Sequence, residues 1–477
     1  MSPTLTNVTT TTATTPIGRA HIDNPNRRNK PQSNATAIGA FLFTSAGMNM
    51  AMGLGWTESA VYTWTKHYCY SWFMGVIIGA IFSMPLSQFM MAKKKWIMAT
   101  AATMVLVDGI LFISFPTDYK AILAARYLNG MAIGLITVPF LVHASEIAVD
   151  SFRGSCLMTE QYSLTFGIAI QMIYTSFWPS SVEFPANRLH GIFDIVFGVF
   201  AWVFLSYFIE SPIDLIRKGD DMAALDCLAR LQYPQIITAR THAQLEQQKY
   251  YFQEEKYRSW WKCVGRSVLP LVKMFFFRSA LLAFSYNLPL NLTLRYSVLI
   301  NEAIWSGTVA AICRIFGAFL AFIMVDHAAR RIPSALAAIA IGILLILQAM
   351  WFENLLANSF DLKDLKIIMA LYMLIQAFAG FFSCYTSVYL AEAFPLRTKP
   401  FFMTFSVVGE QLLQTIFILN IFRKLSNVIL VQGVVALIAG VAFWFTMPET
   451  KNTTLSEAQE KFRKVFSFKR KESVSEA

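Results

Sequence analysis

The chain has 477 residues, of which 56% are hydrophobic and 14% are charged, and its mean hydropathy is +0.48. An ordinary soluble domain is about 45–50% apolar and about 25% charged, so this composition excludes a soluble enzyme and a disordered protein. The net charge of +11 is typical of a membrane protein whose basic loops lie on one side. No aromatic-basic module indicates binding of nucleic acid.

Twelve apolar runs follow one another, and each approaches the roughly 20 residues that a spanning helix needs. They lie at residues 36–55, 70–91, 96–115, 120–143, 155–177, 189–209, 276–299, 303–325, 333–352, 366–391, 400–421 and 426–447. The longest interruption, 210–275, is charged and patterned like amphipathic helix. The sequence therefore predicts an all-α membrane protein with twelve transmembrane helices in two pseudo-symmetric six-helix halves.

The predicted organisation has five parts. They are a disordered cytoplasmic N-terminal tail (1–35), an N-terminal six-helix half (36–209), a cytoplasmic helical linker (210–275), a C-terminal six-helix half (276–447) and a cytoplasmic C-terminal tail (448–477). With both termini inside, 30 of the 40 Lys and Arg residues fall in inner segments and 7 in outer loops, as the positive-inside rule requires. We expect a multi-pass protein of the plasma membrane that functions as a monomer.

The sequence carries no motif for catalysis or for a bound metal. Its six cysteines are scattered without a CxxC pair, and it lacks a P-loop, a nucleophile elbow and HExxH. We therefore expect no enzyme activity, no cofactor, no metal site and no use of ATP. Two halves joined by a cytoplasmic link favour a carrier that binds its solute near the midplane and rocks between two states. A channel is disfavoured because no filter-like loop or charged ring is visible.

Six motifs at predicted helix ends follow one another in the order found in one family. The chain carries RYLNG at 126–130, EIA and RG within 146–154, ESP at 210–212, DHAARR at 326–331, AEAFP at 391–395 and PETK at 448–451. This series resembles the sugar porter family of the major facilitator superfamily over about residues 36–465. Gly55-Trp56-Thr57 is similar to the insect facilitated trehalose transporter-like branch. The resemblance implies the major facilitator fold and sugar transport.

The resemblance also implies that charged residues of these motifs gate the inner side. They are Arg126, Glu146, Arg153, Asp326, Arg330, Arg331, Glu392 and Lys399. Opposite charges within this set can pair across the two halves, hold the inner side shut and separate when it opens. The alternative is a topological charge at a helix end. Lys399 stands where the family has Arg, and Lys cannot form the planar two-pronged bond of Arg. The family's first DxxGRR copy is lost, because residues 89–94 read FMMAKK.

A sugar site needs neutral hydrogen-bond partners and apolar ring surfaces. By resemblance, Gln161 and Asn291 match sugar-contacting residues of spans 5 and 7, and Asn287 shares a helix face with Asn291. The candidate substrate-binding residues are Gln161, Tyr286, Asn287, Asn291, Tyr385, Glu410 and Gln411. The alternative for the amides is hydrogen bonding between helices. The family's motifs of spans 7, 10 and 11 are replaced here, so an ordinary hexose facilitator is not expected.

Two charged residues, Arg314 and Glu410, fall in the middle of predicted spans. An ionised group there is costly unless it is paired or hydrated. One hypothesis is that the two form an intramembrane ion pair. The other is that Glu410 takes up a proton or binds a cationic or polyhydroxyl solute. Asp108 and Asp194 are further intramembrane candidates.

We predict a secondary transporter that moves a sugar or a similar small polyhydroxyl solute by alternating access, as a uniporter or with protons. The alternatives are a transport-incompetent nutrient sensor or scaffold, and a carrier of a non-sugar polar or cationic solute. The expected partners are the solute, the lipid bilayer and, in symport, protons, with no nucleic acid.

Overall fold

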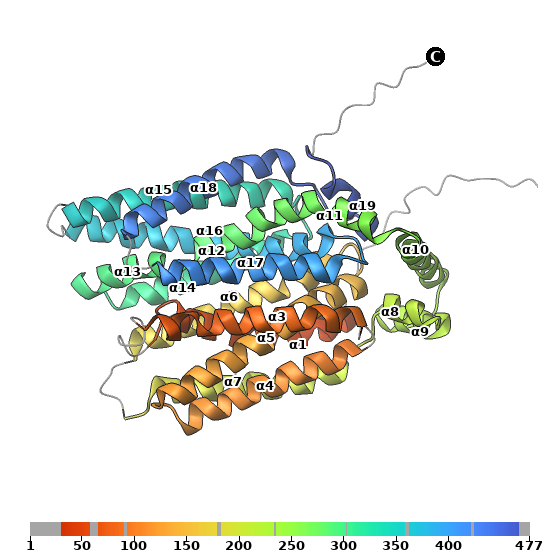
Figure 1. Cartoon of the computed structure of the whole chain (residues 1–477), viewed down its shortest axis with the longest axis horizontal. Helices are drawn as coiled ribbons and strands as arrows, with labels where there is room; N and C mark the ends of the chain where they lie inside the picture. The colour runs from red at the N-terminus through yellow and green to blue at the C-terminus, as the bar shows by residue number, and fades with distance from the viewer. Residues whose placement is uncertain are drawn as a thin grey trace, which may run out of the picture.

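The computed structural model describes residues 30–57, 65–89, 93–178, 183–232, 235–301, 303–357, 362–420 and 424–466. Within these ranges the chain is mostly helical and contains no strand, which confirms the predicted all-α architecture. Figure 1 shows long helices running side by side in one bundle. Most of the predicted N-terminal tail, and the predicted C-terminal tail beyond residue 466, lie outside the described residues.

The N-terminal half of the bundle consists of six helices. They are α1 (Lys30–Gly53), α3 (Lys66–Phe89), α4 (Lys94–Ser114), α5 (Tyr119–Ile147), α6 (Arg153–Phe177) and α7 (Ala186–Phe204). Inside this half α3 packs along α5, α1 along α6 and α4 along α7.

The C-terminal half begins with a segment that is not a regular helix throughout. It starts as α11 (Trp260–Met274), passes through a π-helical turn, η3 (Phe275–Ala280), and continues as α12 (Leu281–Ser285) and α13 (Leu288–Asn301). The other five helices are α14 (Trp305–Met324), α15 (Arg331–Ala357), α16 (Leu362–Ala393), α17 (Lys399–Leu419) and α18 (Leu425–Thr446). Here α15 packs along α18 and α14 along α16.

The first long helical segment of this half is broken between α12 and α13. Tyr286 is extended, with φ −152° and ψ 101°, and Pro289 lies in the first turn of α13, where its missing N–H costs no hydrogen bond. The helix is therefore broken just before Pro289. Such breaks place backbone polar groups at membrane depth, which is tolerated only inside the protein.

Eleven helical segments among the described residues are long and apolar enough to cross a membrane, and Trp260–Val298 counts as one of them. The twelfth predicted span is α6, which buries the polar residues Glu160, Gln161 and Gln171. A helix that carries these side chains has less need of an apolar surface if other helices surround it. α6 meets this condition, because it contacts α1, α14 and α16.

Short helices lie at one end of the bundle, which we call the charged end. They are α8 (Pro212–Lys218), α9 (Asp221–Arg230), α10 (Ala239–Lys256) and α19 (Leu455–Phe462), and Figure 1 shows them at the right. Leu225 and Leu228 of α9 pack with Leu245 of α10 against Ile147 at the end of α5. The amphipathic pattern predicted between the two halves thus covers the end of the N-terminal half.

Helices α3 and α5 approach each other closely through glycine. A Cβ atom built on Gly134 would lie 2.2 Å from the backbone oxygen of Val76, and one built on Gly130 would lie 2.3 Å from that of Trp72. Only glycine allows this separation without a shift of one backbone.

We expect Gly134→Ala to lower the free energy of unfolding by about 1–3 kcal/mol, the usual cost of overpacking. Gly265→Ala is the matched control, since Gly265 lies in α11 with nothing within 4 Å of an added Cβ. Alanine there should stabilise the helix by about 0.5–1 kcal/mol. Thermal unfolding of both purified variants measures the difference, and equal midpoints would contradict the close approach.

Candidate functional site

At the charged end a single carboxylate is held by arginines of both halves. The Oε1 atom of Glu392, in the last turn of α16, lies 2.7 Å from Nε of Arg153 at the start of α6. It lies 3.1 Å from Nη1 of Arg330, which precedes α15. All three side chains are at most 1% exposed. The predicted charge pairing across the two halves is therefore present at Arg153 and Glu392.

Asp326 adds a second link between the halves. Its carboxylate accepts hydrogen bonds from the backbone N–H groups of Gly154 (3.1 Å) and Ser155 (2.9 Å), at the start of α6. It also lies 3.0 Å from Nη2 of Arg330. An acidic group is stabilised at a helix N-terminus by the helix dipole. A Cβ on Gly154 would lie 2.3 Å from Asp326, so this contact requires glycine.

Arg331 forms hydrogen bonds inside the C-terminal half. Its Nε donates to the backbone oxygen of Trp444, 3.0 Å away. The backbone N–H groups of Arg330 and Arg331 donate to Glu449, at 2.8 and 3.1 Å. These bonds join the start of α15 to the end of α18 and to Glu449 just beyond it, which fixes the backbone that carries Arg330.

Glu146 and Lys399 do not pair with each other as the motifs suggested. Nζ of Lys94 lies between Glu146 (2.6 Å) and Asp214 of α8 (2.8 Å), while Lys399 reaches across the halves to Oγ of Ser145 at 2.6 Å. Lys94 belongs to the stretch that lost the first motif copy, and its surviving charge takes the place of a partner from the other half. Burial raises the pKa of Asp214 to about 6, and the Lys94 ammonium opposes this shift.

Arg126 lies away from the charged end, so its predicted place in the inner gate is wrong. It precedes Glu146 by 20 residues in α5, which is about 30 Å of helix. Its Nε donates to Ser71 (3.0 Å) and its Nη1 to the backbone oxygen of Asn49 (3.0 Å), and its guanidinium lies 4.4 Å from the ring centre of Tyr68. These contacts join α1, α3 and α5 within one half.

The two halves also touch at the opposite end of the bundle. Asn291 Nδ2 donates to the backbone oxygen of Leu54 at 2.8 Å, and Lys66 Nζ donates to that of Leu419 at 2.7 Å. The space between the halves is thus bounded by cross-half contacts at both ends.

A buried ion cluster lies between these ends, about two helical turns inside the charged end. Arg278 of η3 donates to both oxygens of Glu160 of α6, at 2.5 and 3.0 Å. Ser387 of α16 donates to the same carboxylate at 2.6 Å. Glu410 of α17 lies 3.5 Å from the remaining nitrogen, Nε of Arg278. Two carboxylates therefore share one guanidinium. The shorter contacts are those between Arg278 and Glu160, and they cross the two halves.

The predicted ion pair between Arg314 and Glu410 is absent. Arg314 donates to Oε1 of Gln376 at 2.7 Å and its guanidinium lies 4.6 Å from the ring centre of Tyr286. The partner of Glu410 is Arg278, which stands near the start of the predicted span 276–299. The helix of α11 runs on into the bundle, and η3 carries Arg278 to membrane depth.

The two predicted asparagines form structural bonds. Asn287 Oδ1 accepts from the backbone N–H of Leu290 (2.9 Å), and its Nδ2 donates to the oxygen of Ala283 (2.8 Å). Asn287 thus caps both sides of the helix break. Asn291 accepts from the hydroxyl of Tyr372 at 2.7 Å, besides its bond to the other half.

The predicted residues Tyr385 and Gln411, and the neighbouring Gln414, retain hydrogen-bonding capacity. Oε1 of Gln411, Oε1 of Gln414 and the hydroxyl of Tyr385 are buried without a hydrogen-bond partner. Nε2 of Gln414 donates to the backbone oxygen of Tyr286 at 2.8 Å, which holds this amide beside the helix break. Gln161 donates to Glu160 at 3.1 Å. These amides and the hydroxyl belong to α6, α16 and α17, helices that contact the other half.

Asp108 and Asp194 form a second buried cluster, wholly inside the N-terminal half. Asp108 accepts from Asn129 at 2.5 Å, and Asp194 lies 3.0 Å from Nε2 of His190. All four residues are fully buried. Since every member belongs to the same half, rocking of the halves leaves this cluster unchanged.

Sequence reasoning missed Glu160, Arg278, Gln376 and Gln414. Glu160 adjoins Gln161 inside a predicted span, and that position was sufficient to mark it as an intramembrane charge. Nothing in the sequence shows that Arg278 faces it. Among the described residues, no group of three or more His, Cys, Asp or Glu side chains is placed to hold a metal ion.

A model of the sugar (and other) transporter family matches residues 31–462. The arabinose-proton symporter of Escherichia coli K12 is 24% identical over 412 residues, covering 82% of this chain and 84% of the symporter. The high-affinity hexose transporter ght4 of Schizosaccharomyces pombe is 26% identical over 151 residues, covering 32% of this chain and 27% of that transporter. These relatives are transporters rather than enzymes.

One similar solved structure is that of the proton:xylose symporter XylE of the major facilitator superfamily, bound to 6-bromo-6-deoxy-D-glucose. It matches with a TM-score of 0.72 at 15% sequence identity, and the match covers 91% of this chain and 99% of that one. The inward open conformation of XylE from E. coli matches with a TM-score of 0.61 at 16% identity, covering 90% and 98%. These matches confirm the predicted major facilitator fold. The insect trehalose transporter-like branch stays a prediction.

We expect Glu392→Gln to loosen the charged end, because Arg153 and Arg330 lose the carboxylate between them. Breaking a buried ion pair costs roughly 3–5 kcal/mol. Cys156, which is 2% exposed in α6, should then react several-fold faster with a thiol reagent, as followed by mass spectrometry.

The control is Glu353→Gln, which removes the half-exposed pair of Glu353 with Lys424 and should leave the labelling of Cys156 unchanged. If Cys156 of Glu392→Gln reacts at the wild-type rate, the carboxylate does not hold this end closed.

Proposed function

The chain belongs to the sugar (and other) transporter family, and on that premise we propose that it moves a sugar or similar small polyhydroxyl solute across a membrane by alternating access. The observation that carries the proposal is the set of buried amide and hydroxyl groups on α16 and α17 that lack a partner. A buried polar group without a partner is costly, and the hydroxyls of a sugar would satisfy several such groups at once.

The contacts at the two ends supply the gates that alternating access needs. Opening the charged end requires Glu392 and Asp326 to separate from α6, whereas opening the other end requires Asn291 to leave Leu54. Each gate is made of hydrogen bonds between the same two halves. A rocking motion that breaks one set can therefore preserve the other, so that the solute meets one side at a time.

The proposal includes the orientation of the chain in the membrane and its action as a single chain. The excess of Lys and Arg supports a cytoplasmic charged end with both termini inside, in the plasma membrane, and a single chain that acts as a monomer. The halves would comprise residues 36–209 and 276–447, with 210–275 and the tails outside them.

Proton coupling is favoured over uniport by the shared guanidinium. While Glu160 engages two nitrogens of Arg278, Glu410 has only a weak contact at 3.5 Å. Among the charged groups near Glu410, Arg278 of η3 and Glu160 of α6 act on it most strongly. A proton on Glu410 would balance the charges of the two carboxylates and the one guanidinium, and the uncharged solute would then bind beside a neutral cluster. The names of the arabinose-proton symporter and the proton:xylose symporter agree with such a mechanism.

A nutrient sensor is the competing function, since it would use the same site without transport. Both would be stabilised by solute against heat, but only a carrier gives saturable flux. A carrier of a cationic solute would instead pair that charge with Glu410.

We expect the protein in proteoliposomes to take up labelled pentoses, hexoses, trehalose or polyols saturably. Gln411→Ala should raise KM about threefold to tenfold, the value of a hydrogen bond worth about 0.5–1.5 kcal/mol, because Oε1 of Gln411 has no protein partner and can accept from the solute. Gln247→Ala, on the exposed side of α10, is the control. Binding without flux would identify a sensor, and neither binding nor flux would exclude these solutes.

We expect Glu410→Gln to retain exchange of labelled solute at equal concentrations but to lose accumulation driven by an inward proton gradient, because an amide carries no titrating proton. Uptake into proteoliposomes with and without the gradient measures both. Glu246→Gln, whose side chain is 72% exposed, is the matched control. Wild-type uptake that ignores the gradient would make the protein a uniporter and Glu410 a structural partner of Arg278.

A further inference from the structure

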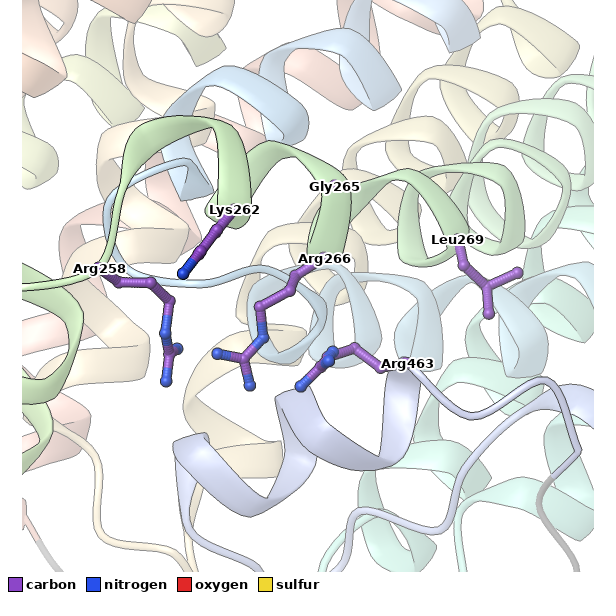
Figure 2. A pocket seen from close by; sticks show the side chains of 6 residues that line it. All are labelled: Arg258, Lys262, Gly265, Arg266, Leu269 and Arg463. Carbon is purple, nitrogen blue, oxygen red and sulfur yellow. The ribbon is translucent and has the colours of Figure 1, made fainter.

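A pocket of about 640 Å³ opens at the charged end, between α11 and α19. Its polar lining is entirely basic: Arg258, Lys262, Arg266 and Arg463. Figure 2 shows these four side chains directed into one space from three segments, namely the turn before α11, α11 itself and the end of α19. Ligand pockets have volumes of about 300–1,000 Å³, so this one has room for a small organic anion.

Two of these cations are free to bind a ligand. Lys262 and Arg463 have no acidic partner among the residues that the structure describes. Arg258 is paired with Glu254 and Glu255 of α10. Arg266 lies 3.9 Å from Glu460, which is too far for a hydrogen bond, and its Nε is buried without a partner.

The pocket is held in place by a buried lysine. Nζ of Lys273, the last but one residue of α11, donates to the backbone oxygens of Phe462 (3.2 Å) and Lys464 (2.6 Å). These two carbonyls flank Arg463. It also donates to the oxygen of Thr446 at the end of α18 (2.7 Å). The guanidinium of Arg463 therefore faces α11 because the backbone on both sides of it is fixed there.

Exposed apolar side chains of α11 lie beside this pocket and suit contact with lipid. Trp261, Val268 and Val272 are 78%, 52% and 50% exposed, and their spacing puts them on one face of the helix. Lys262 and Arg266 occupy the neighbouring face. An apolar face next to a basic one is typical of a helix at the membrane surface, and basic pockets on the cytoplasmic side of transmembrane helices bind phosphorylated head groups.

We propose that this pocket binds a polyphosphorylated anion, in the form of a lipid head group of the adjoining leaflet or of a soluble polyphosphate of similar size. A single phosphate would not need four converging cations, whereas two or more phosphates would match Lys262, Arg266 and Arg463 together. Guanidinium groups bind phosphate oxygens with two parallel hydrogen bonds, so the arginines supply geometry as well as charge.

Binding there would act on the gate at the charged end. The segment before α19 supplies the backbone oxygen of Thr453 that accepts from Nη2 of Arg153 at 2.5 Å, and Gln459 of α19 donates to the oxygen of Phe394 at 2.9 Å. An anion that joins α19 to α11 would stabilise these contacts. Because they belong to the closed charged end, the ligand would favour that state.

The test uses the full chain purified in detergent and a short-chain phosphatidylinositol bisphosphate, with bound lipid counted by native mass spectrometry. We expect wild-type protein to bind it and Lys262→Gln/Arg463→Gln to bind at least tenfold more weakly. Lys218→Gln/Arg230→Gln is the control, since it removes one lysine and one arginine of α8 and α9 outside the pocket. Equal affinity of wild type and the pocket variant, or equal loss in the control, would overturn the proposal.

A second arm separates the two sources of phosphate. Inositol trisphosphate that competes with the lipid would show that the free anion suffices, whereas failure to compete would show that the lipid chains are also needed. Phosphatidylcholine of the same chain length should not bind detectably at the pocket. Because binding is measured without transport, the result is independent of whether the protein carries a sugar.

Discussion

The structure depends on one carboxylate, that of Glu392, held between Arg153 of one half and Arg330 of the other. A buried charge without partners costs several kcal/mol, but a well-bonded buried ion pair gains little over its desolvated cost. The closed charged end is therefore stable without being deeply favoured. When the halves part, water replaces the lost partners. A carrier needs both states at similar free energy, and a buried ionic gate provides that balance better than a large apolar contact.

The buried cluster of Glu160, Arg278 and Glu410 also spans the two halves. Arg278 and Glu410 belong to the C-terminal half, and Glu160 belongs to the other. Opening the charged end removes Glu160 from Arg278, so the guanidinium becomes free to bond Glu410 fully. Arg278 would then face one carboxylate, that of Glu410, instead of two. The proposed coupling of transport to protons would rest on this change of partners around Glu410.

This alternation also explains why the Asp108 cluster is a poor coupling site, although it contains as many carboxylates. Asn129, His190 and Asp194 move together with Asp108 in one half. Rocking changes none of their distances, so it gives no reason for their proton affinity to differ between states. Position relative to the interface, rather than burial, separates a coupling residue from a structural one.

The positions of the helices and the contacts between their ends could be predicted from the sequence. The contacts that depend on the direction in which a side chain leaves its helix could not. The twelve spans and the Arg153–Glu392 contact follow from hydropathy and from motifs at chain positions that must meet at one membrane surface. The pairing of Arg314 with Glu410 failed because depth in the membrane does not tell which way a side chain points. Asn287 was expected to meet solute, yet the break beside Pro289 requires a cap that only the folded backbone reveals.

At the charged end, two buried lysines join the short helices to the bundle. Lys94 joins Glu146 to Asp214 of α8, and Lys273 joins α11 to the end of α19. The short helices outside the bundle are therefore bonded to residues next to the gate. Each half carries one such attachment, α8 on the first and α19 on the second. A shift of α8 would act on Glu146 through Lys94, and a shift of the segment before α19 would act on Arg153 through the backbone oxygen of Thr453.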